Sequence, residues 1–393
     1  MNTEKKLIPL LRFPEFEKDG MWGEKCFGDC LDYEQPQQYL VSSDNYKKEG
    51  TPVLTAGKTF VLGFTDESYG IYRQLPVIIF DDFTTASRYV NFPFKAKSSA
   101  MKMLQNKDGY DLKFMFEALQ NYKYEPKEHQ RHWISIFQNF KTLVPSYSEQ
   151  RKIAECLSTI DSYISSINEK VEQLKAHKKS LLQKLFPQNG KAVPEYRFFE
   201  FVDNGEWEIV KLREIAIRVK NKNKFNEQLP VLTNSATEGI LNQQDYFDRE
   251  IVTRDNLSNY FIVKIDDFVY NPRISSLAPV GPISRNKIER GIMSPLYTIF
   301  RFCKGCIDYF DYYFRTNCWH QYLRSIANSG ARFDRMNITN EEFMNMPIPF
   351  PSVAEQQRIA ECLSSIDRVI RLYSEKASQL EQHKKGLMQQ LFP

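Results

Sequence analysis

The sequence contains no Gly-x-Gly tripeptide in its 393 residues and no G-x-x-x-x-G-K-[ST] segment. The first absence removes the dinucleotide fingerprint and the glycine loop that binds a methyl donor, and the second removes the P-loop of nucleotide hydrolases. The chain therefore lacks the usual signatures of catalysis, which favours a protein that binds.

Long apolar runs are also missing, since no stretch of about 18 apolar residues occurs, and we expect no membrane span. The N-terminal run is too short and too broken by proline for a signal peptide. Seven widely scattered cysteines, an odd number, argue against a disulfide framework and favour the cytoplasm. The formal net charge of +4 permits binding of a polyanion without requiring it.

Metal-ligand spacing occurs in one place, where Cys303 and Cys306 are followed by Cys318 and His320. This set could be a zinc site. A turn in which the cysteines act as small hydrophobic residues is the better interpretation, so we expect no metal.

The dominant feature of the sequence is an internal repeat. Residues 144–187 align with residues 350–393 without a gap, and 25 of the 44 positions are identical. A weaker match precedes each copy, where Arg12-Phe13-Pro14-Glu15-Phe16 corresponds to Arg197-Phe198-Phe199-Glu200-Phe201. Between these anchors the two copies share almost nothing. This pattern is expected if the two connectors share one function while the two globular segments have different functions.

Both copies of the repeat have the apolar spacing of a coiled-coil seam, in steps of three and four residues. A lysine interrupts the seam at equivalent positions, Lys178 and Lys384, and proline closes each helix at Pro187 and Pro393. The seam residues are Ile153, Leu157, Ile160, Ile164, Ile167, Val171 and Leu174 in the first copy and Ile359, Leu363, Ile366, Ile370 and Leu380 in the second.

Two long helices with matching seams in one chain most simply pair with each other, and the chain direction makes the pair antiparallel. The predicted fold class is α/β: two globular α/β domains joined by two long antiparallel coiled-coil helices, arranged as a pseudo-two-fold dumbbell. The alternative is that each helix packs only on its own globular domain.

Several runs in the globular segments predict individual elements. Strands are expected at 75–80, 140–145, 260–265 and 346–351, and short helices at 113–119 and 307–314.

Basic and polar clusters interleaved with aromatic residues occur in both globular segments. Lysine and arginine suit contacts to DNA phosphates, while arginine, serine and threonine can also read base edges. A solvated loop is the alternative for each cluster. The candidate DNA-binding residues are Lys58, Thr84, Thr85, Ser87, Arg88, Tyr89, Lys97, Arg131 and His132 in the first segment and Lys222, Lys224, Arg273, Ser275, Ser276, Arg285, Lys287, Arg332 and Arg335 in the second.

The order of variable segment, helix, variable segment, helix resembles the DNA-specificity subunit of type I restriction–modification enzymes. The motif Pro-Ser-x-x-Glu-Gln-x-x-Ile-Ala carries this resemblance and occurs at 145–154 and again at 351–360. The resemblance covers essentially the whole chain.

This resemblance implies target recognition domains at 1–144 and 188–350, with spacer helices at 145–187 and 351–393. Each domain would read one part of a bipartite, non-palindromic target in double-stranded DNA. Two modification subunits would methylate adenine from S-adenosylmethionine, and two restriction subunits would use ATP and magnesium. The chain itself would be non-catalytic, would bind no cofactor and would act in host defence.

Two other classes of function remain open from the residues alone. A coiled-coil scaffold could recruit partners without touching DNA. An enzyme with an unfamiliar site is the other, although one reaction would not need two dissimilar active sites.

Overall fold

A computed structural model describes residues 8–57, 59–122, 124, 131–188, 191–243, 254–327 and 334–393. The chain forms two compact units. Unit 1 comprises Met1–Glu169 with Ser374–Pro393, and unit 2 comprises Lys170–Tyr373. Each unit contains one globular head and a part of both long helices.

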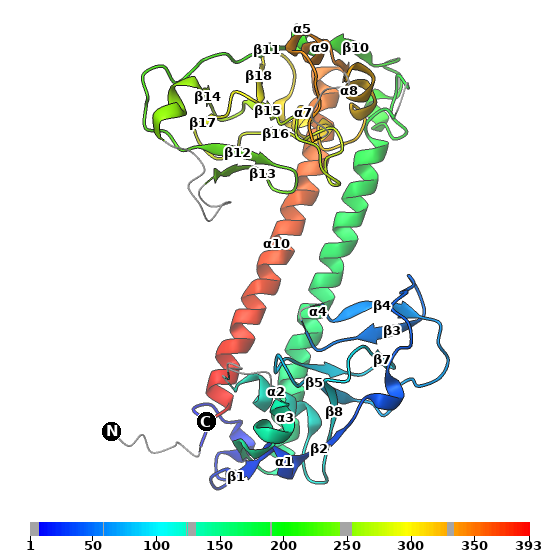
Figure 1. The fold of residues 1–393 in the computed structure, drawn as a ribbon, viewed down its shortest axis with the longest axis vertical. Helices are drawn as coiled ribbons and strands as arrows, with labels where there is room; N and C mark the ends of the chain where they lie inside the picture. Colours follow the sequence, from blue (N-terminus) through cyan, green and yellow to red (C-terminus); the bar gives the residue numbers. More distant parts are fainter. Residues whose placement is uncertain are drawn as a thin grey trace. The chain divides into compact units, whose positions relative to one another are not determined.

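The head of unit 1 is built on a four-stranded antiparallel sheet of order β2-β8-β5-β6 (Figure 1). Its central strand β5 is an unbroken apolar run, and Val77 to Phe80 are buried, as expected for a strand covered on both faces. Helix α2 packs against the sheet, and Asp111 caps it by accepting a hydrogen bond from the Phe114 amide at 2.8 Å. The elements are β2 (Leu31–Glu34), β5 (Val77–Asp81), β6 (Ser87–Val90), β8 (Met101–Asn106) and α2 (Leu112–Gln120).

The described residues of this head form two smaller sheets as well. β1 pairs with β9 where the chain enters and leaves the head, and β3 lies between β4 and β7. The elements are β1 (Gly23–Cys26), α1 (Phe27–Cys30), β3 (Thr51–Leu54), β4 (Val61–Thr65), β7 (Lys95–Ala96), α3 (His132–Ser135) and β9 (Lys141–Val144).

The head of unit 2 repeats this scheme, although its sequence shares almost nothing with the first head. Its four-stranded sheet has the order β11-β18-β15-β16, all antiparallel, and α7 follows β18 as α2 follows β8. The elements are β11 (Ala216–Arg218), β15 (Phe268–Tyr270), β16 (Ile283–Arg285), β18 (Thr298–Phe302) and α7 (Ile307–Tyr313). The duplication therefore extends through the heads, which share their strand order although their sequences do not match.

Among its described residues, the second head also contains three two-stranded sheets and three more short helices. β10 pairs with β19, β12 with β13 and β14 with β17. β19 contains Pro347 and Pro349 and lies in a two-stranded sheet, where a strand edge without amide donors is tolerated. The elements are β10 (Glu208–Lys211), α5 (Leu212–Ile215), β12 (Leu232–Ser235), β13 (Gly239–Asn242), β14 (Phe261–Val263), β17 (Gly291–Met293), α8 (His320–Ile326), α9 (Asn340–Met344) and β19 (Pro347–Phe350).

The strands and short helices predicted in the heads are confirmed. The four predicted strands are β5, β9, β14 and β19, and the two predicted helices are α2 and α7. Each boundary lies within two residues of its prediction.

The two long helices predicted from the repeat are α4 (Tyr147–Lys184) and α10 (Val353–Leu391). Within unit 1, Asp161 contacts Lys384 while Tyr163 contacts Lys376, so the two helices run antiparallel there. The end of α10 enters the core of unit 1 with Leu391 and Phe392. The residues that follow α4, Leu185 and Phe186, enter the core of unit 2 in the same way. Each head is thus closed by the helix of the other repeat.

The seam residues differ in what they contact. Ile153 and Leu157 pack into the core of unit 1, and Ile359 and Leu363 into that of unit 2, so the first turns of each helix serve their own head. Farther along, Ile167 and Val171 are buried. The other seam residues are half-buried: Ile160, Ile164, Leu174, Ile366, Ile370 and Leu380. In the described part of the chain, no helix has both the length and the apolar character needed to cross a membrane.

Candidate nucleic-acid interface

In the first head, the predicted residues Thr84 and Thr85 lie on the loop 82–86 between β5 and β6. The Asp81 carboxylate shapes this loop by accepting hydrogen bonds from the Phe83 and Thr84 amides, at 3.0 and 2.8 Å. Thr85 adopts a φ of 58°, in the left-handed region, which tightens the turn. As a result Thr84 is exposed on a short and well-braced loop.

Beneath this loop lies a buried polar centre at Asp82. Lys102 Nζ is 2.7 Å from Asp82 Oδ2, and the Trp133 amide donates to Asp82 Oδ1 at 2.9 Å. A ring nitrogen of His132 lies 2.5 Å from the Asp82 carbonyl oxygen. His132 is 1% exposed, so it braces the loop from inside, whereas its neighbour Arg131 is exposed.

On β6 only the arginine is free to meet a ligand. Arg88 is exposed and lies over the Phe60 ring. Ser87 accepts a hydrogen bond from Gln120 at 2.6 Å, and Tyr89 is half-buried against Phe116.

Of the two lysines predicted in this head, Lys97 lies among the described residues. Lys97 is ion-paired with Asp44, and this hydrogen bond raises the Lys97 pKa. Lys58 lies outside the described residues.

In the second head, the connection 271–282 corresponds to the loop 82–86 and is much longer. It brings together two groups of predicted DNA-binding residues, one around Arg273 and one around Arg335. The Ile274 amide donates to the Asp334 carbonyl at 3.0 Å, and the Met336 amide donates to the Pro272 carbonyl at 2.9 Å. Arg273 and Arg335 therefore lie opposite each other in an antiparallel bridge. Ser275 and Ser276 are exposed on the same connection, and Arg332 lies outside the described residues.

A second basic loop, 221–227, surrounds the fully buried Asn223. The Asn223 side chain holds Glu227 through two hydrogen bonds. Its Oδ1 accepts from the Glu227 backbone N–H at 2.9 Å, and its Nδ2 donates to the Glu227 carbonyl at 3.1 Å. Lys222 and Lys224 are exposed on this loop, and Phe225 is 90% exposed. Phe225 was not among the predicted residues, although an aromatic residue directly after a run of lysines is a usable signal for stacking on bases.

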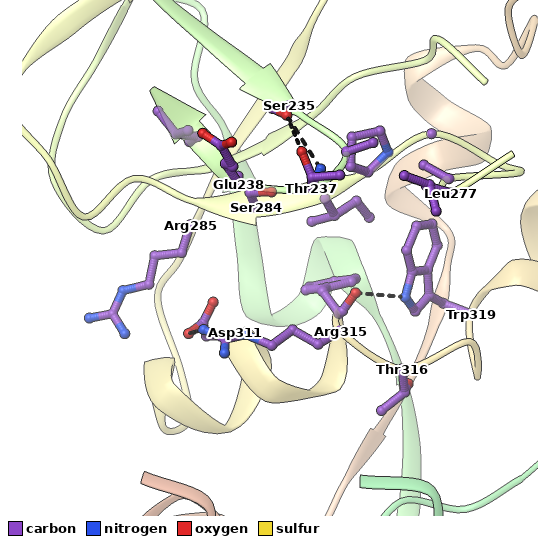
Figure 2. Close-up of a pocket in the computed structure, with 18 of the residues that line it drawn as sticks. Ser235, Thr237, Glu238, Leu277, Ser284, Arg285, Asp311, Arg315, Thr316 and Trp319 are labelled. Atoms are coloured by element: carbon purple, nitrogen blue, oxygen red, sulfur yellow. Dashed lines mark hydrogen bonds and ion pairs between the residues drawn. The ribbon is translucent and has the colours of Figure 1, made fainter. Parts of the chain in front are cut away.

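Arg285 and Lys287 line an open cavity of about 570 Å³ between the β12–β13 hairpin, the 271–282 connection and α7. Figure 2 shows Ser235, Thr237 and Glu238 on the hairpin side, Asp311 and Arg315 across from them, and the Arg285 side chain at the edge of the cavity.

Both predicted cations of this cavity are already paired with carboxylates. Arg285 is held between Asp266 and Asp308, and Lys287 shares Asp311 with Arg315. The wall therefore alternates donors and acceptors, which suits base edges better than phosphates.

Two further lining residues, Arg315 and Trp319, were not predicted, and a third, His320, was considered only as a possible zinc ligand. Burial, with a contribution from Arg324, lowers the pKa of His320, so the ring is neutral at pH 7 and can both donate and accept. Trp319 donates its indole N–H to the Phe314 carbonyl at 3.3 Å and is otherwise packing. Arg315 and Trp319 lie in the connection between α7 and α8, His320 is the first residue of α8, and no local pattern marks them as part of a DNA-binding site.

The cysteines considered as zinc ligands are free thiols here. Cys303 Sγ lies 3.8 Å from the Arg301 carbonyl, and burial raises the pKa of Cys318. In the described ranges, no three His, Cys, Asp or Glu side chains form a cluster that could hold a metal ion.

Comparison with known proteins points to one family. A model of the type I restriction modification DNA specificity domain matches residues 204–382. The chain is 30% identical over 373 residues to the type I restriction enzyme EcoR124I/EcoR124II specificity subunit of Escherichia coli, covering 88% of this chain and 87% of that protein.

More distant likenesses agree with this one. The MjaVIII specificity subunit of Methanocaldococcus jannaschii is 29% identical over 277 residues, 64% of this chain and 61% of that protein. The crystal structure of a type I restriction-modification S subunit from M. genitalium matches the fold with a TM-score of 0.57 at 14% identity. That match covers 98% of this chain and 99% of the other.

Proposed function

Because the chain belongs to the DNA-specificity subunits of type I restriction–modification systems, we propose that its two heads read the two halves of a bipartite, non-palindromic DNA target. A subunit of this family gives the enzyme its sequence specificity and is not itself the catalyst. We assign residues 1–144 and 188–350 as target recognition domains, and residues 145–187 and 351–393 as the spacer.

One observation carries this proposal: the heads share a scaffold but differ in the loop that the scaffold presents. The strand order is the same, yet the connection at the edge hairpin is residues 82–86 in one head and 271–282 in the other. Two different loops on one framework suit two different base sequences, so the target would lack two-fold symmetry.

The exposed polar residues on these loops are the proposed contacts. Bases would be read by Thr84 and Arg88 in the first head and by Arg273, Ser275 and Ser276 in the second. Arg131, Lys222 and Lys224 suit phosphates. The buried His132 and the half-buried Tyr89 would support the first loop.

The long helices would fix the unread gap between the half-sites. A helix of 38 residues is about 57 Å long at 1.5 Å per residue, and half-sites read from one face of DNA lie roughly 34–36 Å apart. Holding two heads at a set separation makes the second contact intramolecular, which strengthens binding without further base reading.

The partners that we propose are two modification subunits, which would use S-adenosylmethionine, and two restriction subunits, which would use ATP and magnesium. The E. coli relative is by name a subunit of a type I restriction enzyme, which supports assembly of this chain into a comparable complex. Such a complex acts on cellular DNA, so its compartment would be the cytoplasm.

The experiment is to co-purify the chain with its modification subunits and map methylated adenines on genomic DNA. Thr84→Ala with Arg88→Ala should change one half of the methylated motif only, and Arg273→Ala with Ser275→Ala the other half only. The exposed Arg213, replaced by alanine, is the matched control and should leave the motif intact. If the chain were a scaffold that does not touch DNA, all variants would keep the same methylated motif. DNA binding by the complex would then not weaken steeply as the salt concentration rises.

A further inference from the structure

A second cavity of the second head, of about 360 Å³, lies at one end of the four-stranded sheet. Arg218 at the end of β11, Tyr270 at the end of β15 and Thr298 at the start of β18 contribute to it, because the antiparallel pairing brings these strand ends together. The segment that contains Arg335 closes the other side.

The described lining of this cavity is positively charged. Its lining includes two arginines, Arg218 and Arg335, and no aspartate or glutamate. Arg335 forms one long ion pair, in which the carboxylate of Asp334, 62% exposed, lies 3.7 Å from Arg335 Nε, too far for a hydrogen bond.

Both guanidinium groups also have an unused buried donor. The Nε atoms of Arg218 and Arg335 are buried and have no hydrogen-bond partner. A buried donor without a partner costs about 1–3 kcal/mol, and more when the group is charged. Such groups are rare in folded proteins and call for an explanation such as a bound ion or ligand.

The remaining polar groups of the lining suit an anion. Asn337 and Asn340 offer side-chain amides, and the Tyr297 hydroxyl, which shares a hydrogen bond of 3.2 Å with the Thr233 hydroxyl, lies in the same lining. The Thr298 hydroxyl donates to Asn340 Oδ1 at 3.3 Å, which leaves the Asn340 amide nitrogen available. Arginine pairs with phosphate oxygens through two parallel N–H groups, which an oxyanion between two arginines could accept.

We propose that this cavity binds a phosphate-type oxyanion, and that in the DNA complex this oxyanion is a backbone phosphodiester held by Arg218 and Arg335. This inference rests on the proposed function, since it names how the second head would hold the DNA backbone beside the bases that it reads. Arg218 becomes a DNA-binding residue that no basic cluster in the sequence marks.

The first arm of the test uses the purified full chain and inorganic phosphate. Isothermal titration should detect phosphate binding that is lost in Arg218→Gln and in Arg335→Gln and retained in the control Arg213→Gln. Because neither Nε atom has a hydrogen-bond partner in the free protein and the ion pair of Arg335 with the exposed Asp334 is long, neither substitution should lower the Tm in phosphate-free buffer. A Tm that falls would instead mean that these arginines hold the fold, and would overturn the assignment.

The second arm measures DNA affinity of the chain with its modification subunits at several salt concentrations. Loss of one phosphate contact should reduce the slope of log affinity against log salt by about 0.9. The loss should be equal for target and unrelated DNA, because a phosphate contact carries no sequence information. Arg335→Lys, which keeps the charge, should lose less of the slope than Arg335→Gln.

The outcomes separate the two proposals. If the arginine variants lose phosphate binding but keep the salt slope of the parent complex on DNA, the cavity binds a free oxyanion and the phosphodiester assignment is overturned. An unchanged slope with no phosphate binding by the parent chain would overturn the site altogether. A parent complex without any salt slope would overturn the proposed function instead, and the phosphate titration would still decide whether the cavity binds an oxyanion.

Discussion

Lys384 of α10 donates hydrogen bonds to both carboxylate oxygens of Asp161 on α4, at 2.7 and 2.9 Å. The repeat reproduces this contact 206 residues apart, where Lys178 of α4 donates to Asp367 of α10 at 2.5 Å. These are the two lysines that interrupt the apolar seam, so each interruption has a partner on the opposite helix. A polar residue within a seam specifies register, because a shifted pairing would leave its charge among apolar side chains.

Each head also contributes to its own lysine–aspartate pair. In unit 1, Glu117 of α2 accepts from Lys384 at 2.9 Å, and Lys113 pairs with both Glu117 and Asp161. In unit 2, the Tyr312 hydroxyl donates to Asp367 at 2.8 Å. The pairs therefore fix the head to the helices as well as one helix to the other.

Lys384→Met is expected to destabilise the chain by about 3 kcal/mol, because it leaves the buried Glu117 with one cation fewer. The neighbouring and exposed Lys385, replaced by methionine, adds the same apolar surface without breaking a pair. Urea unfolding followed by circular dichroism measures both. Equal midpoints for the two variants would contradict the role given to Lys384.

A second expectation concerns the two equivalent tryptophans. Arg197 pairs with Glu355 through two hydrogen bonds, at 2.8 and 2.9 Å, and the Trp207 indole donates to the same carboxylate at 3.1 Å. Arg12 pairs with Glu149 in the same way, but the Trp22 indole N–H has no partner.

Trp207→Phe should therefore cost about 1 kcal/mol more than Trp22→Phe, since only the first removes a hydrogen bond to a buried charge. Unfolding of each variant in urea gives the comparison. If Trp22→Phe were the more damaging change, the asymmetry would be wrong.

The acid stability of the chain should depend on the two seam aspartates. Burial raises the pKa of Asp161, but hydrogen bonds from Lys113 and Lys384 outweigh it and the pKa is lowered; Asp367 behaves likewise through Lys178 and Tyr312. The unfolded chain, with an ordinary aspartate pKa of about 3.9, takes up protons first as the pH falls. The stabilisation is thus complete above that value and is lost as the pH falls through the lower folded pKa.

Asp161→Asn with Asp367→Asn should reduce the pH dependence of the urea midpoint below about pH 4. The exposed Asp203, replaced by asparagine, should leave it unchanged. An identical acid slope in the double variant and the parent chain would refute the linkage.

The length of the helix pair should set the gap in the target. Seven residues of heptad pattern inserted after Glu169, with seven more after Tyr373, keep the seam and lengthen both helices by about 10 Å. The methylated motif should keep both half-sites while its gap grows by up to about three base pairs. Genome-wide mapping of methylated adenines reads both properties, and an altered half-site with an unaltered gap would contradict the spacer role.

The sequence by itself determined the duplication, the two long helices and the family, because these depend on periodic or exact local patterns. The seam spacing, the repeated Pro-Ser-x-x-Glu-Gln motif and the apolar run of β5 each act within a few residues of the chain. The family resemblance followed from the repeated motif, and the comparisons confirm it.

Only the tertiary structure decided which residues share a surface. The common strand order of the heads was hidden, since many sequences satisfy the same burial pattern. The antiparallel bridge of Arg273 with Arg335, and the strand ends that bring Arg218 to the cavity of Arg335, join residues that are far apart along the chain. His132 lies next to Arg131 in the sequence, yet only one of them reaches the surface. Local sequence records residue type, whereas exposure and proximity depend on how distant segments pack.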